Sequence, residues 1–366
     1  MRHLIFTVLF VFIASLVLGG CGFKDIDKRF FVVATGIDHS DNPNKPFRVT
    51  LRLAVTSPKI EPGAGKSQLE TIDAKTIAEG VRELKAYVDK ELDFGHCKIF
   101  MIGEKLARKE MDQAINWMTR RRDIQMIANV TIGHPTAEAI LKIQPKNERY
   151  PGNTLFLSFG KEGTDSSYTV TEYIFGMRKR RTEKGIDPVL PIIMPENETY
   201  RISQAGVLNK KKLIIILSPE ETQLYNQITN KYLKSSLGGN VEQDPYVLAV
   251  GRIQSRFKIK NNAQGKPVVE MRIKIHGLLE EAPKLVFDKD WASIEQELAK
   301  QYSKSVVRLL KKFQRQGVDP IGFGLKYRAT HYSGGDKSWQ EWQGIYPNIE
   351  FDVQTRVTIE GTGLIK

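Results

Sequence analysis

The stretch Phe47-Arg48-Val49-Thr50-Leu51-Arg52-Leu53-Ala54-Val55 decides the fold class of this chain. Its apolar and polar side chains alternate with a period of two, which is typical of a β-strand. Just upstream, residues 30–37 are also strand-like, and residues 38–46 between the two runs are rich in turn-forming residues. The two runs predict an antiparallel hairpin with one face in water.

Helical and strand-like segments follow this hairpin in alternation. Ile77, Val81, Leu84 and Val88 recur at helical spacing, and Asp73 is expected to cap that helix. Residues 57–67 contain two prolines and two glycines and are predicted to be a loop. Further along, the pattern predicts helices at 106–118 and 136–143, and strands around Ile99 and at 126–132. The first half therefore has the predicted order β-β-α-β-α-β-α.

The second half is also a mixture of strands and helices. Strands are predicted at 205–208, 213–217, 246–259, 268–279 and 349–359, and helices at 219–231 and 291–316. Asp319-Pro320 is expected to be an N-cap with proline at the first helical position. Between the halves, Pro188, Pro191 and Pro195 mark a segment suited to a domain boundary.

We therefore predict an α+β protein of two α+β domains, with mixed or antiparallel sheets and helices packed on one face. About 346 residues remain after the predicted leader, which is enough for two domains by length. The predicted division is a leader at 1–20, an N-terminal domain at 21–200 and a C-terminal domain at 201–366.

The first residues have the pattern of a bacterial lipoprotein signal peptide. Arg2 provides a positive charge, and residues 4–18 form an apolar run that is short for a bilayer span but fits a signal peptide. Leu18-Gly19-Gly20-Cys21 then resembles a lipobox, which predicts cleavage between Gly20 and Cys21 and lipidation of Cys21. The alternatives are an ordinary secretory signal or a plain transmembrane anchor.

Charge limits the classes of partner. The chain carries a formal charge of +13, and removal of Arg2, the one Lys or Arg of the leader, leaves +12. A basic surface can contact anionic lipid headgroups or nucleic acid, or can simply be solvated. No nucleic-acid-binding motif is present, so we expect membrane lipid rather than nucleic acid. Arg178-Lys179-Arg180-Arg181 is the densest basic run, and its contact with lipid, protein or water is left open.

The sequence contains no motif that argues for an enzyme. Gly63-Ala64-Gly65-Lys66-Ser67 resembles a phosphate-binding loop but has Ile60 where that motif needs glycine. The histidines are too far apart for a local metal motif, and the acidic pairs Glu280-Glu281 and Asp288-Asp290 are expected to be solvated. We therefore predict no catalytic residue, no cofactor and no metal site.

Two other features are assigned to the protein core. Cys97, the one thiol besides Cys21, lies beside a predicted buried strand and is expected to be structural. Trp339 and Trp342 stand in an aromatic group with Tyr346, which is expected to cover the core of the last domain, although such a group can also bind a partner or a sugar.

An ordered set of motifs resembles the Ger(x)C family, the lipoprotein subunits of spore germinant receptors. After the lipobox come a Val-Ala-Thr-Gly-Ile-Asp strand ending at Asp38, then His96-Cys97-Lys98 with the apolar strand to Gly103-Glu104, and later Arg122-Asp123. The second half adds Gly277-Leu278-Leu279-Glu280, Asp319-Pro320-Ile321-Gly322-Phe323-Gly324 and Gly361-Thr362-Gly363-Leu364. Cys97 directly after His96 departs from the family pattern.

The resemblance implies a non-enzymatic function at a membrane. If this resemblance holds, the chain is a lipid-anchored subunit of a nutrient-germinant receptor on the outer face of the spore inner membrane. Its partners would be a polytopic transporter-like subunit and a second membrane subunit, and nutrients such as amino acids or sugars would trigger germination. The alternatives are a lipoprotein that binds a small solute directly, and a surface hydrolase. The sequence identifies neither the germinant nor the contact surface.

Overall fold

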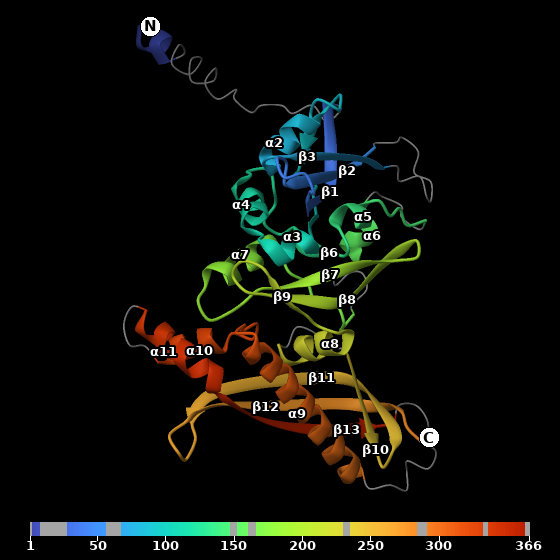
Figure 1. The fold of residues 1–366 in the computed structure, drawn as a ribbon, viewed down its shortest axis with the longest axis vertical. Coiled ribbons are helices and arrows are strands. Elements are labelled where there is room, and N and C mark those ends of the chain that lie inside the picture. The colour runs from blue at the N-terminus through green and yellow to red at the C-terminus, as the bar shows by residue number, and fades with distance from the viewer. Residues whose placement is uncertain are drawn as a thin grey trace.

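The computed structural model describes residues 2–7, 28–55, 67–146, 152–159, 166–229, 235–283, 291–331 and 336–362. It contains a nine-stranded and a four-stranded sheet. Figure 1 shows the larger sheet in the upper part of the molecule and the smaller sheet at the bottom, with a long helix, α9, across it. The α+β fold class is confirmed.

The nine-stranded sheet is mixed. Its order is β3-β2-β1-β5-β6-β7-β8-β9, with β4 also paired to β1. The steps from β1 to β5, β6 and β7 are parallel, and the outer steps are antiparallel. Its strands are β1 (Arg29–His39), β2 (Phe47–Ala54), β3 (Ser67–Ala74), β4 (Glu91–Asp93), β5 (Ile99–Gly103), β6 (Asn129–Gly133), β7 (Val189–Glu196), β8 (Thr199–Leu208) and β9 (Leu213–Ile216).

The four-stranded sheet is formed by the rest of the chain. Its order is β10-β11-β12-β13, with antiparallel pairs except for the parallel pair of β12 and β13. Its strands are β10 (Ser235–Val241), β11 (Asp244–Asn261), β12 (Pro267–Glu281) and β13 (Glu350–Gly361).

The helices follow the chain order α2 to α11. They are α2 (Ile77–Leu84), α3 (Glu104–Lys109), α4 (Asp112–Arg120), α5 (Ala137–Leu141), α6 (Asn153–Leu157), α7 (Ile174–Thr182), α8 (Pro219–Ile228), α9 (Trp291–Arg315), α10 (Phe323–Thr330) and α11 (Lys337–Ile345), and a 3-10 turn η3 (Tyr346–Asn348) follows. The long helix α9 has a continuous buried stripe, including Leu298, Val306 and Leu310, so its length and position agree with the helical spacing.

The nine-stranded sheet has apolar clusters on both faces. One cluster joins the sheet to α2, α3, α4 and α7. The other packs α5 and α6 against the opposite face, through residues such as Ala34, Ile140 and Leu155. Whereas we predicted helices on one face, this sheet is covered on both. As a result, the polar residues Thr50 and Arg52 of β2 are buried, and the predicted hairpin of β1 and β2 has no fully wet face.

Two predictions next to this hairpin are wrong. Strand β3 begins at Ser67, where we predicted only a loop, and its Thr71 lies opposite Thr50 of β2. Asp73 does not cap the next helix, because it accepts hydrogen bonds from Arg48 and Ser40; Thr76 caps α2 instead. Residues 57–66 of the predicted loop lie outside the described residues.

The predicted helix at 106–118 is two helices. The break lies at Glu110, which is extended, and at Met111, which is buried and donates its N–H to the carbonyl of Lys211. That tertiary bond ends α3 and starts α4 in a new direction. Helical spacing alone does not predict this break, because α3 and α4 each have an apolar face.

The proline-rich segment between the halves is a strand rather than a linker. Pro191 lies inside β7, opposite Ala205 of β8. The boundary predicted at residue 200 therefore falls within β8, in a β7–β8 hairpin of the first sheet. The division of the chain into domains at that residue stays a prediction. Strand β10, which contains Gly238 and Gly239, was not predicted.

Candidate functional site

The predicted lipidation site lies outside the described residues. After the predicted leader, the described part of the chain begins at Lys28, and β1 starts at the next residue. Arg29 forms an ion pair with Asp93 of β4, so the first residues of β1 are fixed to the sheet. Lys28 follows Cys21 by seven positions, which limits the distance between these two residues to about 25 Å. Among the residues that the structure describes, no helix is long and apolar enough to span a bilayer.

Cys97 is a structural residue, as predicted. Its side chain is fully buried, and Sγ lies 3.3 Å from Thr35 Oγ1 and 3.4 Å from the carbonyl oxygen of Ile99. Burial raises the pKa of the Cys97 thiol to about 12, so the reactive thiolate is absent at neutral pH.

The basic run at 178–181 is partly internal. Arg180 is largely buried and donates to the carbonyls of Asp187 (3.1 Å) and Pro320 (3.2 Å). Arg181 donates to the carbonyl of Lys210 at 3.0 Å and forms an ion pair with Asp112. Half of the run therefore holds α7 to distant parts of the chain, while Arg178 and Lys179 are exposed.

Lys210 and Asp187 extend this set of contacts. Lys210, in the turn between β8 and β9, donates to the carbonyls of Arg180 (2.6 Å) in the last turn of α7, of its C-cap Glu183 (2.7 Å) and of Ile186 in the segment that follows. Its Nζ lies 3.3 Å from Asp187 Oδ1. A lysine at the C-terminus of a helix supplies donors for carbonyls that have no partner in the helix.

Asp319 completes what we call the junction cluster: Arg180, Asp187, Lys210 and Asp319. The carboxylate of Asp319 is buried and accepts the N–H groups of Gly322, Phe323 and Gly324 at 2.7 to 3.1 Å. Its own N–H donates to Asp187 Oδ2 at 2.7 Å. Asp319 therefore organises the start of α10, although the helix begins at Phe323 with Gly322 as N-cap and not directly after Pro320 as predicted.

At the junction, the backbone of Gly185 approaches that of Gly324 so closely that a side chain on Gly185 would not fit. A Cβ on Gly185 would lie 2.4 Å from the carbonyl carbon of Gly324, and the φ of Gly185 is +85°. The N–H of Leu325 donates to the carbonyl of Gly185 at 2.8 Å. The segment after α7 thus packs directly on the start of α10, and the two sheets are joined by main-chain contact as well as by the junction cluster.

The aromatic group near the C-terminus belongs to the core. Trp342 is 1% exposed, and its ring lies 5.3 Å from the rings of Tyr327 and Tyr346. Trp339 is partly buried against the same cluster. This confirms the core assignment of these tryptophans.

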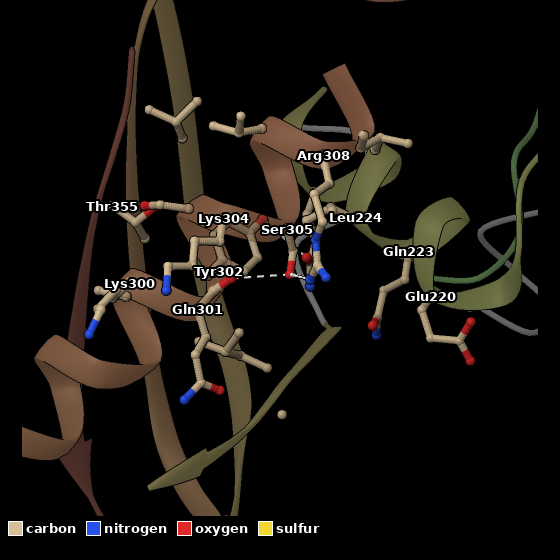
Figure 2. Close-up of a pocket in the computed structure, with 18 of the residues that line it drawn as sticks. Glu220, Gln223, Leu224, Lys300, Gln301, Tyr302, Lys304, Ser305, Arg308 and Thr355 are labelled. Atoms are coloured by element: carbon tan, nitrogen blue, oxygen red, sulfur yellow. Dashed lines mark hydrogen bonds between the residues drawn. The ribbon is translucent and has the colours of Figure 1, made fainter. Parts of the chain in front are cut away.

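A groove of about 1640 Å³ runs along α9, and we call it the α9 groove. Residues of α8, α9, β10, β11 and β13 line it. Figure 2 shows Lys300, Lys304 and Thr355 on one side of α9, and Arg308, Gln223 and Glu220 on the other. The groove therefore has one branch between α9 and β13 and another between α9 and α8.

Local contacts position the helices that form the groove. Ser218 and Glu221 form a reciprocal capping box at the start of α8. Lys312 of α9 donates to both carboxylate oxygens of Glu221, at 2.6 and 2.8 Å. On the other branch, Ser303 of α9 donates to Thr355 of β13 at 2.8 Å. These bonds fix α9 between α8 and the edge of the sheet.

Among the described residues, the remaining chemical motifs do not form a site. Glu280 and Glu281 are exposed at the end of β12, while Asp288, Asp290 and residues 63–66 lie outside the described residues. Ser67 begins a strand and not the helix that a phosphate-binding loop needs. In the described ranges, no three His, Cys, Asp or Glu side chains are placed to hold a metal ion.

Sequence reasoning missed the α9 groove and the junction cluster. The groove is made by five elements that are far apart in sequence, so only its parts had local signals. Ser218 and Glu221 have the spacing of a capping box, and Lys300 and Lys304 share one face of a predicted helix. For the junction, Asp319 was singled out, but its partners Asp187 and Lys210 carry no motif.

Two family matches cover nearly the whole chain. Residues 22–195 match the family described as “Spore germination protein N-terminal domain”, and residues 203–363 match “Spore germination B3/ GerAC like, C-terminal”. The chain therefore belongs to the Ger(x)C family of spore germination proteins.

Individual relatives agree with this assignment. The chain is 24% identical to spore germination protein KC of Bacillus subtilis (strain 168), over 96% of this chain and 94% of that one. It is 20% identical to spore germination protein GerQC of Bacillus cereus, over 82% of this chain and 84% of that one. Its fold is similar to the crystal structure of the GerBC protein, with a TM-score of 0.57 and 17% identity, over 89% of this chain and 96% of that one.

Proposed function

We propose that this chain is a lipid-anchored, non-enzymatic subunit of a spore nutrient-germinant receptor. Diacylglycerol on Cys21 holds it on the outer face of the spore inner membrane. There it contacts the other receptor subunits, a polytopic transporter-like protein and a second membrane protein. Membership of the spore germination family supports this proposal.

The observation that carries the proposal is the lipobox Leu18-Gly19-Gly20-Cys21 close before the folded body. Each buried CH₂ of a lipid contributes about 0.8 kcal/mol, and stable anchoring needs two acyl chains, which a diacylglyceryl group supplies. The short connection to β1 then keeps the folded body near its membrane partners. At such a raised local concentration, individually weak protein contacts are sufficient for assembly.

The test is Cys21→Ala, with Cys97→Ala as the matched control. Cys21→Ala spores should lose this protein from the membrane fraction and germinate slowly with nutrients, yet respond normally to a trigger that bypasses the receptors. Cys97→Ala removes the other, buried thiol and should leave the membrane location unchanged. Membrane retention of the Cys21→Ala protein, or a normal nutrient response, would contradict the proposal.

A further inference from the structure

The outer edge of β13 has unpaired backbone groups. Strand β13 pairs with β12 in regular parallel register as far as Ile359. The N–H of Ile359 points away from β12, because it donates to Glu295 of α9 at 2.8 Å. Since backbone groups alternate sides along a strand, the N–H groups of Val353 and Thr355 also point outward. Among the described residues, neither of these two N–H groups has a hydrogen-bond acceptor.

The α9 groove runs along this same edge. Phe351, Val353 and Thr355 line it from β13, all half-buried, and Val307 lines it from α9. Above this largely apolar floor stand Lys300 and Lys304, both exposed, one helical turn apart. Within the part of the chain that the structure describes, Lys304 has no ion-pair partner, and Lys300 contacts Glu297 at 3.3 Å on its own helix.

An exposed edge strand is a template for another strand, and proteins usually protect such edges with charges, bulges or covering elements. Here α9 leaves the edge open at 351–355 and places apolar surface and two lysines beside it. Addition of a strand to a sheet edge is a common mode of peptide recognition, in which the backbone gives affinity and alternate side chains give specificity.

We propose that an extended segment of a protein partner adds as a fifth strand beside β13. Its inward side chains are apolar and rest on Val353 and Val307, and it carries acidic residues that meet Lys300 and Lys304. This inference rests on the proposed function, because it names the kind of contact through which the chain joins its receptor partners.

The position of the groove favours protein over lipid as the occupant. Figure 1 places the four-stranded sheet at the bottom of the molecule and β1, where the chain leaves the leader, in the upper part. The α9 groove therefore lies in the half of the molecule away from β1, the first strand after the proposed lipid anchor in the sequence. A strand edge also needs hydrogen-bonding partners, which acyl chains do not supply.

The first experiment compares Val353→Pro with Val353→Ala in spores. Proline removes one outward N–H without breaking the ladder to β12, a position at which a strand tolerates proline. We expect nutrient germination to be about tenfold slower with Val353→Pro and nearly unchanged with Val353→Ala. Because proline can affect folding, Lys300→Glu with Lys304→Glu is a second variant. It should slow germination similarly, while the control pair Lys311→Glu with Lys326→Glu should not.

The second experiment places a photoreactive amino acid at Thr355 or, as a control, at Lys326, in the full chain in spore membranes. We expect cross-linking from position 355, and not from 326, to a segment of another receptor subunit with alternating apolar and acidic residues. Cross-links only to lipid, to a second copy of this chain or within the chain would overturn the inference. Normal germination of both groove variants would do the same.

Deletion of the whole chain separates this inference from the proposed function. If deletion abolishes the nutrient response and the groove variants behave as wild type, the strand-addition inference fails and the receptor function stands. If deletion leaves the nutrient response intact, the proposed function itself fails.

Discussion

Asp319 is a buried acid whose charge depends on the folded environment. Desolvation by burial raises its pKa to about 7, against the lowering effect of three backbone N–H donors, and the charge of nearby Asp187 raises it further. In the unfolded chain an aspartate titrates near 3.9. Between about pH 4 and pH 7 the folded protein therefore binds a proton that the unfolded chain has released, so stability from this group falls as pH rises.

We expect the melting temperature to show this contribution. Relative to Asp319→Asn, which cannot titrate, the wild-type protein should lose stability as the pH is raised from 4 to 7, and the difference should then level off. Thermal unfolding of both proteins at several pH values measures it. Parallel curves for the two proteins would mean that Asp319 keeps an ordinary pKa.

At the residue scale, sequence reasoning succeeded where the environment is local. Cys97 was assigned to the core because the apolar strand at 99–102 follows it directly. Arg52 was placed in water by alternation, yet it is fully buried and bonded to Ser67 and Tyr200. Tyr200 lies 148 residues away in the sequence, and no pattern within β2 predicts that contact.

At the scale of single elements, the capping box of α8 gives a direct test. Ser218→Ala removes the side-chain acceptor for the N–H of Glu221 and should lower the free energy of unfolding by about 1 kcal/mol. Ser218→Asp keeps a capping oxygen and should restore most of that loss. Urea unfolding of the three proteins measures the effect. Equal stability of Ser218→Ala and wild type would show that Glu221 holds α8 through Lys312 alone.

Long periodic elements were predicted best. The strands β11 and β12 and the helix α9 were expected close to their observed bounds, because each has an unbroken pattern over many residues. Strand β3 was missed because most of its residues are polar and half-buried, and Leu69 and Ile72 do not alternate with a period of two. Strand β7 was missed because Pro191 and Pro195 suggest a linker, although β7 pairs with β6 and β8 and Pro191 is buried between them.

For the whole molecule, the junction cluster is expected to hold the two sheets together. Arg180→Ala removes the ion pair with Glu172 and the donor to the carbonyls of Asp187 and Pro320, and should destabilise the protein by about 3 kcal/mol. Arg178→Ala, in the same basic run but exposed, should change stability by less than about 0.5 kcal/mol. Chemical denaturation compares the two, and limited proteolysis near residues 183–188 should be faster only in Arg180→Ala. Equal behaviour would contradict this role.

Some parts of the candidate site can be predicted from the sequence and others cannot. The lipobox is a contiguous motif and can be identified without a structure. The groove edge at β13 depends on which strands pair and on where α9 crosses the sheet, and the junction joins residues 180, 187, 210 and 319 through tertiary contacts. Long-range pairing of this kind has no short-range signature.

The β7–β8 hairpin limits how the two halves of this protein can recombine with those of its relatives. The two family matches meet between residues 195 and 203, inside this hairpin. Genetic exchange at that point would join β7 of one relative to β8 of the other, so the strand pair of each product would combine side chains from two parents. The two matched regions therefore cannot be exchanged between relatives as independent modules, and substitutions across the hairpin are expected to be selected together.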